Sequence, residues 1–302
     1  MPKPGETLTA TAQELTERRE PFVRATVVRV QRPTSAHAGD TALVYANGEI
    51  DGFVGGTCVE ASVRQYGLQA LSAQEPLLLR VVPGEPSHIR EEGAVQVSNP
   101  CLSGGVIEIF LEPWLPTPRV LVVGSTPVAQ ALASLGVDLG LDMVLTTGPS
   151  AEPHADDAAL IVASHGRDEE PALEAALKAG VPYVALVASA TRGAAVLASL
   201  DVDEEQRSRV FSPAGLQLGA RTPGEIALSI LAQLVSERAA RRLGEPAPAS
   251  AVVTAIDPVC GMSVAAIPAT LHVEHARATV YFCSEGCRTT FLADPDAYAA
   301  AS

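Results

Sequence analysis

Short apolar runs alternate with stretches of helical periodicity between residues 119 and 243, and this alternation constrains the fold more than any other feature. The strand-like runs are 119–123, 143–146, 159–163, 183–187 and 210–211, and the helical runs are 127–135, 169–179, 193–200 and 224–242. Strands that alternate with helices of this length form a parallel sheet, because each return to the same edge needs a crossover. The sequence therefore predicts an α/β fold with a doubly wound parallel sheet.

The turn after the first of these strands fits a dinucleotide-binding fingerprint only in part. Gly124 and Ala129 occupy the first and third positions of Gly-x-Gly-x-x-Gly/Ala, but Thr126 replaces the glycine that admits the pyrophosphate. Pro127 removes an amide donor, and 146–148 offers no acid for a ribose. A nicotinamide-dependent oxidoreductase, using NAD(P), is therefore the alternative rather than the leading function.

Two polar segments follow strands of this sheet, at the edge where such sheets bind ligands. His165 and Arg221 are candidates there for contact with a phosphate or another anion. Helix capping is the competing explanation, with Asp168 as one N-cap and Thr222 as another. Both explanations stay open from the sequence.

The sequence predicts an N-terminal α+β domain at residues 16–113, and its main candidate site is a cysteine that follows two glycines. The expected strands are 22–30, 41–45, 50–54, 77–82 and 106–111, with helices at 12–19 and 59–71. Asn47-Gly48 is a strong hairpin signal, and the hairpin leads to Gly55, Gly56 and Cys58. Cys58 is thus expected at a helix N-terminus, where amide groups and the helix dipole favour an anion.

A second cysteine lies in a similar setting. Cys101 precedes Gly104 and Gly105, which lead into the strand at 106–111. Glycine lets the backbone approach a ligand closely, so both cysteines are predicted to be presented to a ligand. Burial as small apolar side chains is the competing interpretation for both.

The C-terminal 45 or so residues carry the other three cysteines. A Pro- and Ala-rich linker, 244–255, precedes a small module at 256–299. Cys283 and Cys287 are spaced one helical turn apart, and with Cys260 they form a candidate three-thiolate site for Cu(I) or Zn(II). His272, His275 or a water would complete the site. A reduced core without metal is the alternative.

Charge, hydrophobicity and cysteine number limit the class of partner and the cellular compartment. Thirty-five acidic against 21 basic residues give a net charge of −14, which disfavours a nucleic-acid partner. No apolar run has the length of a membrane span, and the N-terminal residues lack the apolar core of a signal peptide. The lack of both features predicts a reducing, cytoplasmic setting, in which five cysteines, an odd number, indicate thiols or metal ligands rather than disulfides.

Several motifs, in order, resemble those of one family. Residues 33–36, 39–40, 55–60 and 99–105 resemble the N-terminal domain of the XdhC/CoxI accessory proteins. Residues 164–166, 180–184, 213–215 and 226–230 resemble the Rossmann-like half of the same family, which covers 119–243. Asp257-Pro258-Val259-Cys260-Gly261-Met262 and Tyr281-Phe282-Cys283-Ser284 resemble the YHS metal-binding module, with Phe282 where that module's name has histidine.

The resemblance implies a maturation factor for molybdenum hydroxylases of the xanthine dehydrogenase or carbon monoxide dehydrogenase type. Such proteins bind molybdenum cofactor, as molybdopterin or its cytosine dinucleotide, while a cysteine desulfurase supplies sulfur, and they pass it to the apoenzyme. They are often homodimers. The site residues implied are Cys58 and Cys101 at the molybdenum or sulfur-transfer position. The other cofactor contacts expected are Gly55, Gly56, Glu60, Gly104, Gly105, Gly124, His165 and Arg221. A metal sensor or metal-delivery protein that acts through the YHS module is a further alternative.

Overall fold

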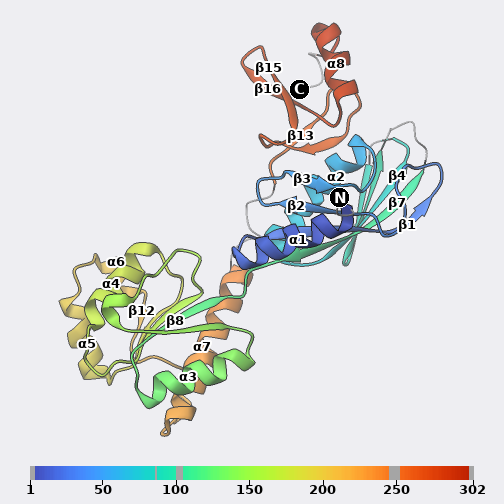
Figure 1. Ribbon diagram of the computed structural model, residues 1–302. Helices are drawn as coiled ribbons and strands as arrows, with labels where there is room; N and C mark the ends of the chain where they lie inside the picture. Colours follow the sequence, from blue (N-terminus) through green and yellow to red (C-terminus); the bar gives the residue numbers. More distant parts are fainter. Residues whose placement is uncertain (1–3, 86, 100–104, 245–251, 299–302) are drawn as a thin grey trace. The chain divides into compact units, whose positions relative to one another are not determined.

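The computed structural model describes residues 4–85, 87–99, 105–244 and 252–298 (Figure 1). It divides into two compact units, one of Met1–Pro116 with Ala247–Ser302 and one of Thr117–Pro246. The C-terminal module, expected as a separate domain, therefore packs with the N-terminal domain. Among the described residues, no helix is both long and apolar enough to cross a membrane.

The first unit is built on a mixed seven-stranded sheet. Its elements are α1 (Pro4–Glu17), β1 (Phe22–Gln31), β2 (Thr41–Tyr45), β3 (Ile50–Gly52), α2 (Thr57–Ala73), β4 (Leu77–Pro83), β5 (Ser87–Glu91), β6 (Ala94–Asn99) and β7 (Val106–Trp114). The strand order is β3-β2-β1-β7-β4-β6-β5, and of these described strands only β4 and β6 pair in parallel. The predicted hairpin is confirmed, because β2 and β3 pair antiparallel around Gly48 at φ +86.

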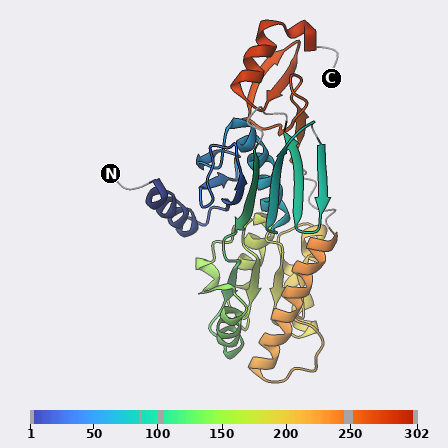
Figure 2. The ribbon, with the colours of Figure 1, turned by 90° about the vertical axis from the view of Figure 1, so that its right-hand side faces the viewer.

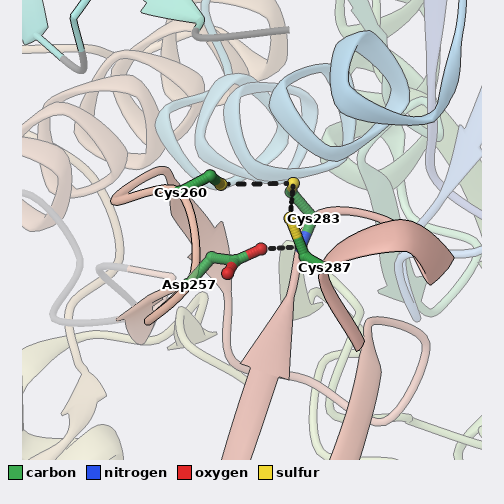
Figure 3. A group of neighbouring side chains, drawn as sticks. All are labelled: Asp257, Cys260, Cys283 and Cys287. Atoms are coloured by element: carbon green, nitrogen blue, oxygen red, sulfur yellow. Dashed lines mark hydrogen bonds between the residues drawn. The ribbon is translucent and has the colours of Figure 1, made fainter. Parts of the chain in front are cut away.

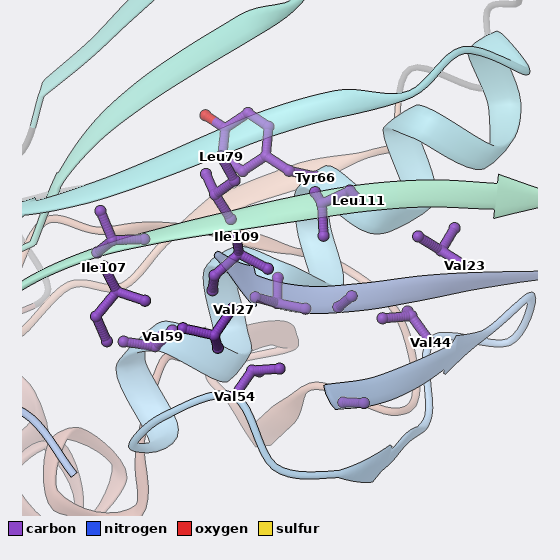
Figure 4. Packing of buried hydrophobic residues seen from close by; sticks show 14 of the residues in the cluster. Val23, Val27, Val44, Val54, Val59, Tyr66, Leu79, Ile107, Ile109 and Leu111 are labelled. Atoms are coloured by element: carbon purple, nitrogen blue, oxygen red, sulfur yellow. The ribbon is translucent and has the colours of Figure 1, made fainter. Parts of the chain in front are cut away.

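Helix α2 packs one face against this sheet (Figure 4). Val59, Val63 and Tyr66 enter a core that includes Ile109 and Leu111. The apolar spacing at 59–71 predicted the helix itself. The helix is more deeply buried than one packed face explains, since Ala61, Ser62 and Gln65 are buried as well. Those residues lie beneath the C-terminal module.

The module consists of two small hairpins and a helix. Its elements are β13 (Thr254–Ile256), β14 (Ser263–Ala265), β15 (Leu271–His275), β16 (Ala278–Phe282), α8 (Glu285–Ala293) and the 3-10 turn η2 (Pro295–Tyr298). Strand β14 contacts α2, and both views place the module beside that helix (Figures 1 and 2). The Ile267 side chain occupies the space that a Cβ at Gly48 would need. The module is therefore seated on the N-terminal domain along two elements.

The second unit has the predicted doubly wound parallel sheet. Its elements are β8 (Arg119–Val123), α3 (Pro127–Asp138), β9 (Asp142–Thr146), η1 (Gly148–Ser150), β10 (Ala159–Val162), α4 (Glu169–Ala179), β11 (Val184–Leu186), α5 (Ala190–Ser199), α6 (Glu204–Ser208), β12 (Val210–Phe211) and α7 (Pro223–Gly244). All neighbours in the order β12-β11-β10-β8-β9 pair in parallel. Side chains of α3 and α7 pack on one face and those of α4 and α5 on the other.

Three expectations about elements were wrong or incomplete. Helix α1 begins at Pro4 rather than at residue 12, because Leu8 as well as Ala12 and Leu15 packs toward Phe22. The predicted strand at 50–54 ends at Gly52. Strands β5 and β6 and helix α6 were not anticipated.

Candidate functional site

Cys58 lies in the first turn of α2, as its spacing predicted. Gly56 is the N-cap residue, and Gly55 before it is buried at φ +141. A Cβ at Gly55 would lie 3.1 Å from the Val59 side chain, so this turn requires glycine. Cys58 is half-buried rather than exposed, because the C-terminal module packs over it.

The three cysteines of the module converge from two segments (Figure 3). Cys260 lies in the turn between β13 and β14, where the Gly261 N–H donates to the Asp257 carbonyl. Cys283 follows directly after β16, and Cys287 lies in the first turn of α8, where its N–H donates to the Ser284 hydroxyl at 3.2 Å. The loop and the helix start thus bring together residues more than 20 positions apart.

Distances within this group suit a thiophilic metal. The Cys283 sulfur lies 3.6 Å from that of Cys260 and 3.7 Å from that of Cys287. With an Asp257 carboxylate oxygen, these ligand atoms all lie within 4.8 Å of one another. Sulfurs bound at about 2.3 Å to one tetrahedral zinc ion are about 3.8 Å apart, so the three thiols have the spacing of a metal site.

The thiols lie within hydrogen-bonding distance of one another. The hydrogen bond between Cys260 and Cys283 lowers the pKa of Cys260 despite its partial burial. The pKa of Cys283 is raised, first by its bond to Cys260 and then by its contact with Cys58. Burial raises the pKa of Cys287 to about 12. One sulfur is thus already biased toward the thiolate that a metal binds.

Asp257 is a residue that the sequence argument missed. Its side chain is fully buried, and its two oxygens accept the N–H groups of Cys283 at 2.8 Å and Val259 at 2.9 Å. The carboxylate therefore ties the Cys260 turn to the end of β16. The Asp-Pro turn signal after a strand could have indicated this role.

The histidines do not join the cluster. The ligand group found among the described residues contains no histidine. His272 contacts the Thr270 carbonyl through Nδ1 at 2.7 Å, and His275 packs edge-on against Phe291. Phe282 is buried against the same Phe291 ring. Completion of the site by His272 or His275 is therefore not supported by the described geometry.

Cys58 reaches this cluster from the N-terminal domain. Its sulfur lies 4.0 Å from that of Cys283, across a small buried interface formed by Ala61, Met262 and Val264. Cys58 lies outside the mutually close ligand group but contacts it through Cys283. Cys58 and the module cysteines, which the sequence treated as separate sites, are thus adjacent.

A cavity of about 620 Å³ continues from this interface along α2. Ser62 and Gln65 line it from α2, Arg90 from β5, and Met262 from the module. Gln65 is 4% exposed, and its side-chain oxygen has no hydrogen-bond partner in the described structure. A buried oxygen without a partner is costly, so the cavity suits a ligand that donates a hydrogen bond.

Gly124 and Thr126 have structural roles in the turn after β8. A Cβ at Gly124 would lie 2.4 Å from the Ala163 carbonyl, and Thr126 donates to that carbonyl at 2.8 Å. Thr126 also accepts from the Ala129 N–H, which takes up a donor that a phosphate would use. These contacts fill the turn, so the altered fingerprint does not offer the space and the N–H groups that a dinucleotide's pyrophosphate needs.

His165 and Arg221 are exposed, at the carboxyl end of β10 and before α7. The N–H groups of Arg221 and Thr222 donate to Glu225, as in a capping box. Asp168 is the N-cap residue of α4 but makes no side-chain capping bond. Buried Glu169 instead accepts from the Gly166 N–H at 2.8 Å and pairs with Arg192 at 2.6 Å, an ion pair that the sequence did not indicate.

Four candidates of the N-terminal domain remain, of which the structure describes two. Glu60 is half-buried in the first turn of α2. Gly105 packs against the Pro33 carbonyl so closely that a Cβ would clash at 2.0 Å. Cys101 and Gly104 lie outside the described residues.

Comparison with known proteins identifies the domains. Residues 15–82 match the XdhC and CoxI family, residues 120–234 match the XdhC Rossmann domain, and residues 255–302 match the YHS domain. The chain combines both XdhC domains with a YHS domain. The resemblance drawn from the motifs is therefore confirmed.

Three relatives extend this finding. The uncharacterised protein YqeB of Escherichia coli is 29% identical over 74% of this chain and 45% of its own length. A Bacillus subtilis protein named as a probable subunit of xanthine dehydrogenase is 26% identical over 43% of this chain and 46% of its own. The molybdenum cofactor insertion chaperone PaoD of E. coli is 26% identical over 72% of this chain and 83% of its own. The chain thus spans about half the length of the first two.

Proposed function

We propose that this XdhC–YHS protein is a molybdenum cofactor chaperone that supports sulfuration of the cofactor and its insertion into a molybdenum hydroxylase. Its two XdhC domains and its similarity to an insertion chaperone support this proposal. The observation that carries it is the thiol of Cys58 at the N-terminus of α2, one helical turn before Ser62, which lines a cavity. Thiolates bind molybdenum, and a helix N-terminus favours an anion.

The proposed cofactor site runs along α2. Cys58 stands at the molybdenum or sulfur-transfer position, with Cys101 as a second thiol. Gln65 lies seven residues further on, about 10 Å along the helix axis. The pterin ring has N–H donors for the Gln65 oxygen, and Arg90 supplies a positive charge for its phosphate. His165 and Arg221 are proposed as anion contacts of the second unit.

The proposed partners, compartment and oligomeric state follow from the role of a cofactor chaperone. The client is a xanthine dehydrogenase or carbon monoxide dehydrogenase type apoenzyme, and a cysteine desulfurase is the sulfur donor. The protein acts in the cytoplasm, as a homodimer. The thiols of the YHS module bind Zn(II) or Cu(I).

Cofactor retention tests the proposal. Wild type and Cys58→Ala are purified from cells that make molybdopterin, and bound pterin is measured by fluorescence after oxidation. Retention should fall at least about tenfold in Cys58→Ala, because the metal–sulfur bond is lost. Exposed Thr57, changed to Ser in the same helical turn, is the control. Equal retention in Cys58→Ala and wild type would remove Cys58 from the site.

Metal handling through the module is a second candidate function, favoured by the three converging thiols. A nicotinamide-dependent reaction is the third. Titration with NADH and NADPH separates the nicotinamide-dependent reaction from the other two functions. The filled turn at Gly124 predicts no saturable binding of either nucleotide.

A further inference from the structure

The candidate metal site of the YHS module supplies three thiols, one ligand fewer than a tetrahedral ion takes. Structural zinc sites are almost always four-coordinate, and thiophilic ions prefer sulfur over oxygen. Two groups stand close enough to be considered, the Asp257 carboxylate and the Cys58 thiol.

Asp257 is already engaged. Each of its oxygens accepts a main-chain N–H, at 2.8 and 2.9 Å, in a fully buried position. These two bonds fix the carboxylate as the link between the Cys260 turn and the end of β16. Since a thiophilic ion prefers sulfur to oxygen, the structure favours Asp257 as a support of the site and a thiol as the fourth ligand.

Cys58 is the softer ligand of the two. Its sulfur lies 4.0 Å from that of Cys283, close to the 3.6 and 3.7 Å that separate Cys283 from its neighbours in the module. We infer that Cys58 is the fourth thiolate, so that one metal ion is held by the three cysteines of the module and by the first turn of α2. Rotation about the Cα–Cβ bond of Cys58 moves its sulfur without moving the helix.

The surrounding packing keeps the two sides in place. Ala61 of α2 is buried against Met262 and Val264, next to the sulfurs. Ile267 sits over Gly48 at a second point of contact. Cys58 and Cys287 each lie in the first turn of a helix, and the positive ends of both helix dipoles favour thiolates. Thiol protons pass to solvent as the metal binds, and no oxidation is involved.

One consequence rests on the proposed function. A thiolate bound to the ion of the module is withdrawn from molybdenum. Metal in the module and cofactor at Cys58 therefore compete for one sulfur, and release of the metal makes the cofactor position available.

Cobalt substitution tests the ligand set in the full chain. Co(II) is added to metal-free, reduced wild type, Cys58→Ser and the control Thr57→Ser, and the sulfur-to-cobalt charge-transfer absorption is recorded. That absorption should fall by about a quarter in Cys58→Ser, since four thiolates become three, and zinc affinity should fall about tenfold or more. Absorption and affinity equal to wild type in Cys58→Ser would overturn the inference.

Alkylation of the wild-type chain gives a test that needs no variant. Metal-free and zinc-loaded protein are treated with iodoacetamide, and the modified cysteines are located by mass spectrometry. Zinc should slow the reaction of Cys58 together with that of Cys260 and Cys287. Protection of the module cysteines without protection of Cys58 would contradict the inference. Both tests use the metal without pterin, so their failure leaves the cofactor proposal to its own experiment.

Discussion

At the scale of single residues, buried polar groups determine how well the site is held. Asp257 has both carboxylate oxygens committed to N–H donors. In Asp257→Asn, one of these oxygens becomes an NH₂ group that faces a donor. We expect the module to lose about 1–3 kcal/mol of stability and the chain to bind zinc more weakly.

Competition with a chromophoric chelator measures that loss of zinc affinity. Asp296→Asn is the matched control, because Asp296 is an exposed carboxylate of the same module. An affinity in Asp257→Asn as high as that of the control would show that the turn holds without its carboxylate.

Glu169 gives the second unit a predicted pH dependence. Burial raises the pKa of this carboxyl, but the bonds from Arg192, the Gly166 N–H and Ser164 outweigh it and leave the pKa below 4.5. A carboxyl with a lowered pKa stabilises the fold above pH 4.5, and this contribution is lost as the pH falls through the folded pKa. In Glu169→Gln, stability should be lower by about 1–3 kcal/mol at pH 7, and the difference from wild type should shrink in acid.

Hydrogen exchange of the β10 and β11 amides at pH 7 and below 4.5 measures this difference, once rates are corrected for intrinsic exchange. Glu205→Gln, at an exposed position in α6, is the control. A difference between Glu169→Gln and wild type that is unchanged across these pH values would refute the assignment.

At the scale of elements, α2 lies between the sheet and the module. Val59 and Val63 face the sheet, while Ala61 is buried under the module. Ala61→Arg places a charged side chain in that interface. We predict that it separates the module from α2, speeds alkylation of Cys58 several-fold and lowers cobalt charge transfer as Cys58→Ser does.

The control for that variant is Ala73→Arg, at the exposed C-terminal end of the same helix. Alkylation of Cys58 in Ala61→Arg at the wild-type rate would mean that the interface tolerates the charge and would contradict the packing argument. Far-UV circular dichroism of both variants checks that α2 remains helical.

The sequence predicted elements with a strong local signal. The apolar runs of β8 and β10 and the Asn47-Gly48 turn are examples, because their patterns are set by neighbours in the chain. Strands β5 and β6 were missed because each is short, and the alternation in β6 rests on only two apolar side chains, Val95 and Val97. The second buried face of α2 was missed for a different reason: Ala61 and Ser62 carry little hydrophobic signal, and their partners lie about 200 residues away.

At the scale of the whole molecule, the candidate site also depends on contacts between residues far apart in the sequence, which the sequence pattern does not reveal. Spacing alone grouped Cys283 with Cys287, which share a helix start, and the ligand set proposed with Cys260 lies together in the structure. The adjacency of Cys58 depends on how the module packs within the first unit. A tertiary contact between segments this far apart leaves no periodicity in the sequence.

Removal of the module is the change that separates the two proposed roles of Cys58. A chain that ends at Gly244 keeps α2 and its sheet but lacks the three module cysteines. If the module withdraws Cys58 from the cofactor when metal is bound, zinc should reduce pterin retention in the full chain and have little effect on the shortened one. Pterin fluorescence with and without zinc measures this, with the shortened Cys58→Ala chain as the control for binding at other places. Equal inhibition by zinc in both chains would assign the effect to a metal site outside the module, and the competition for Cys58 would be refuted.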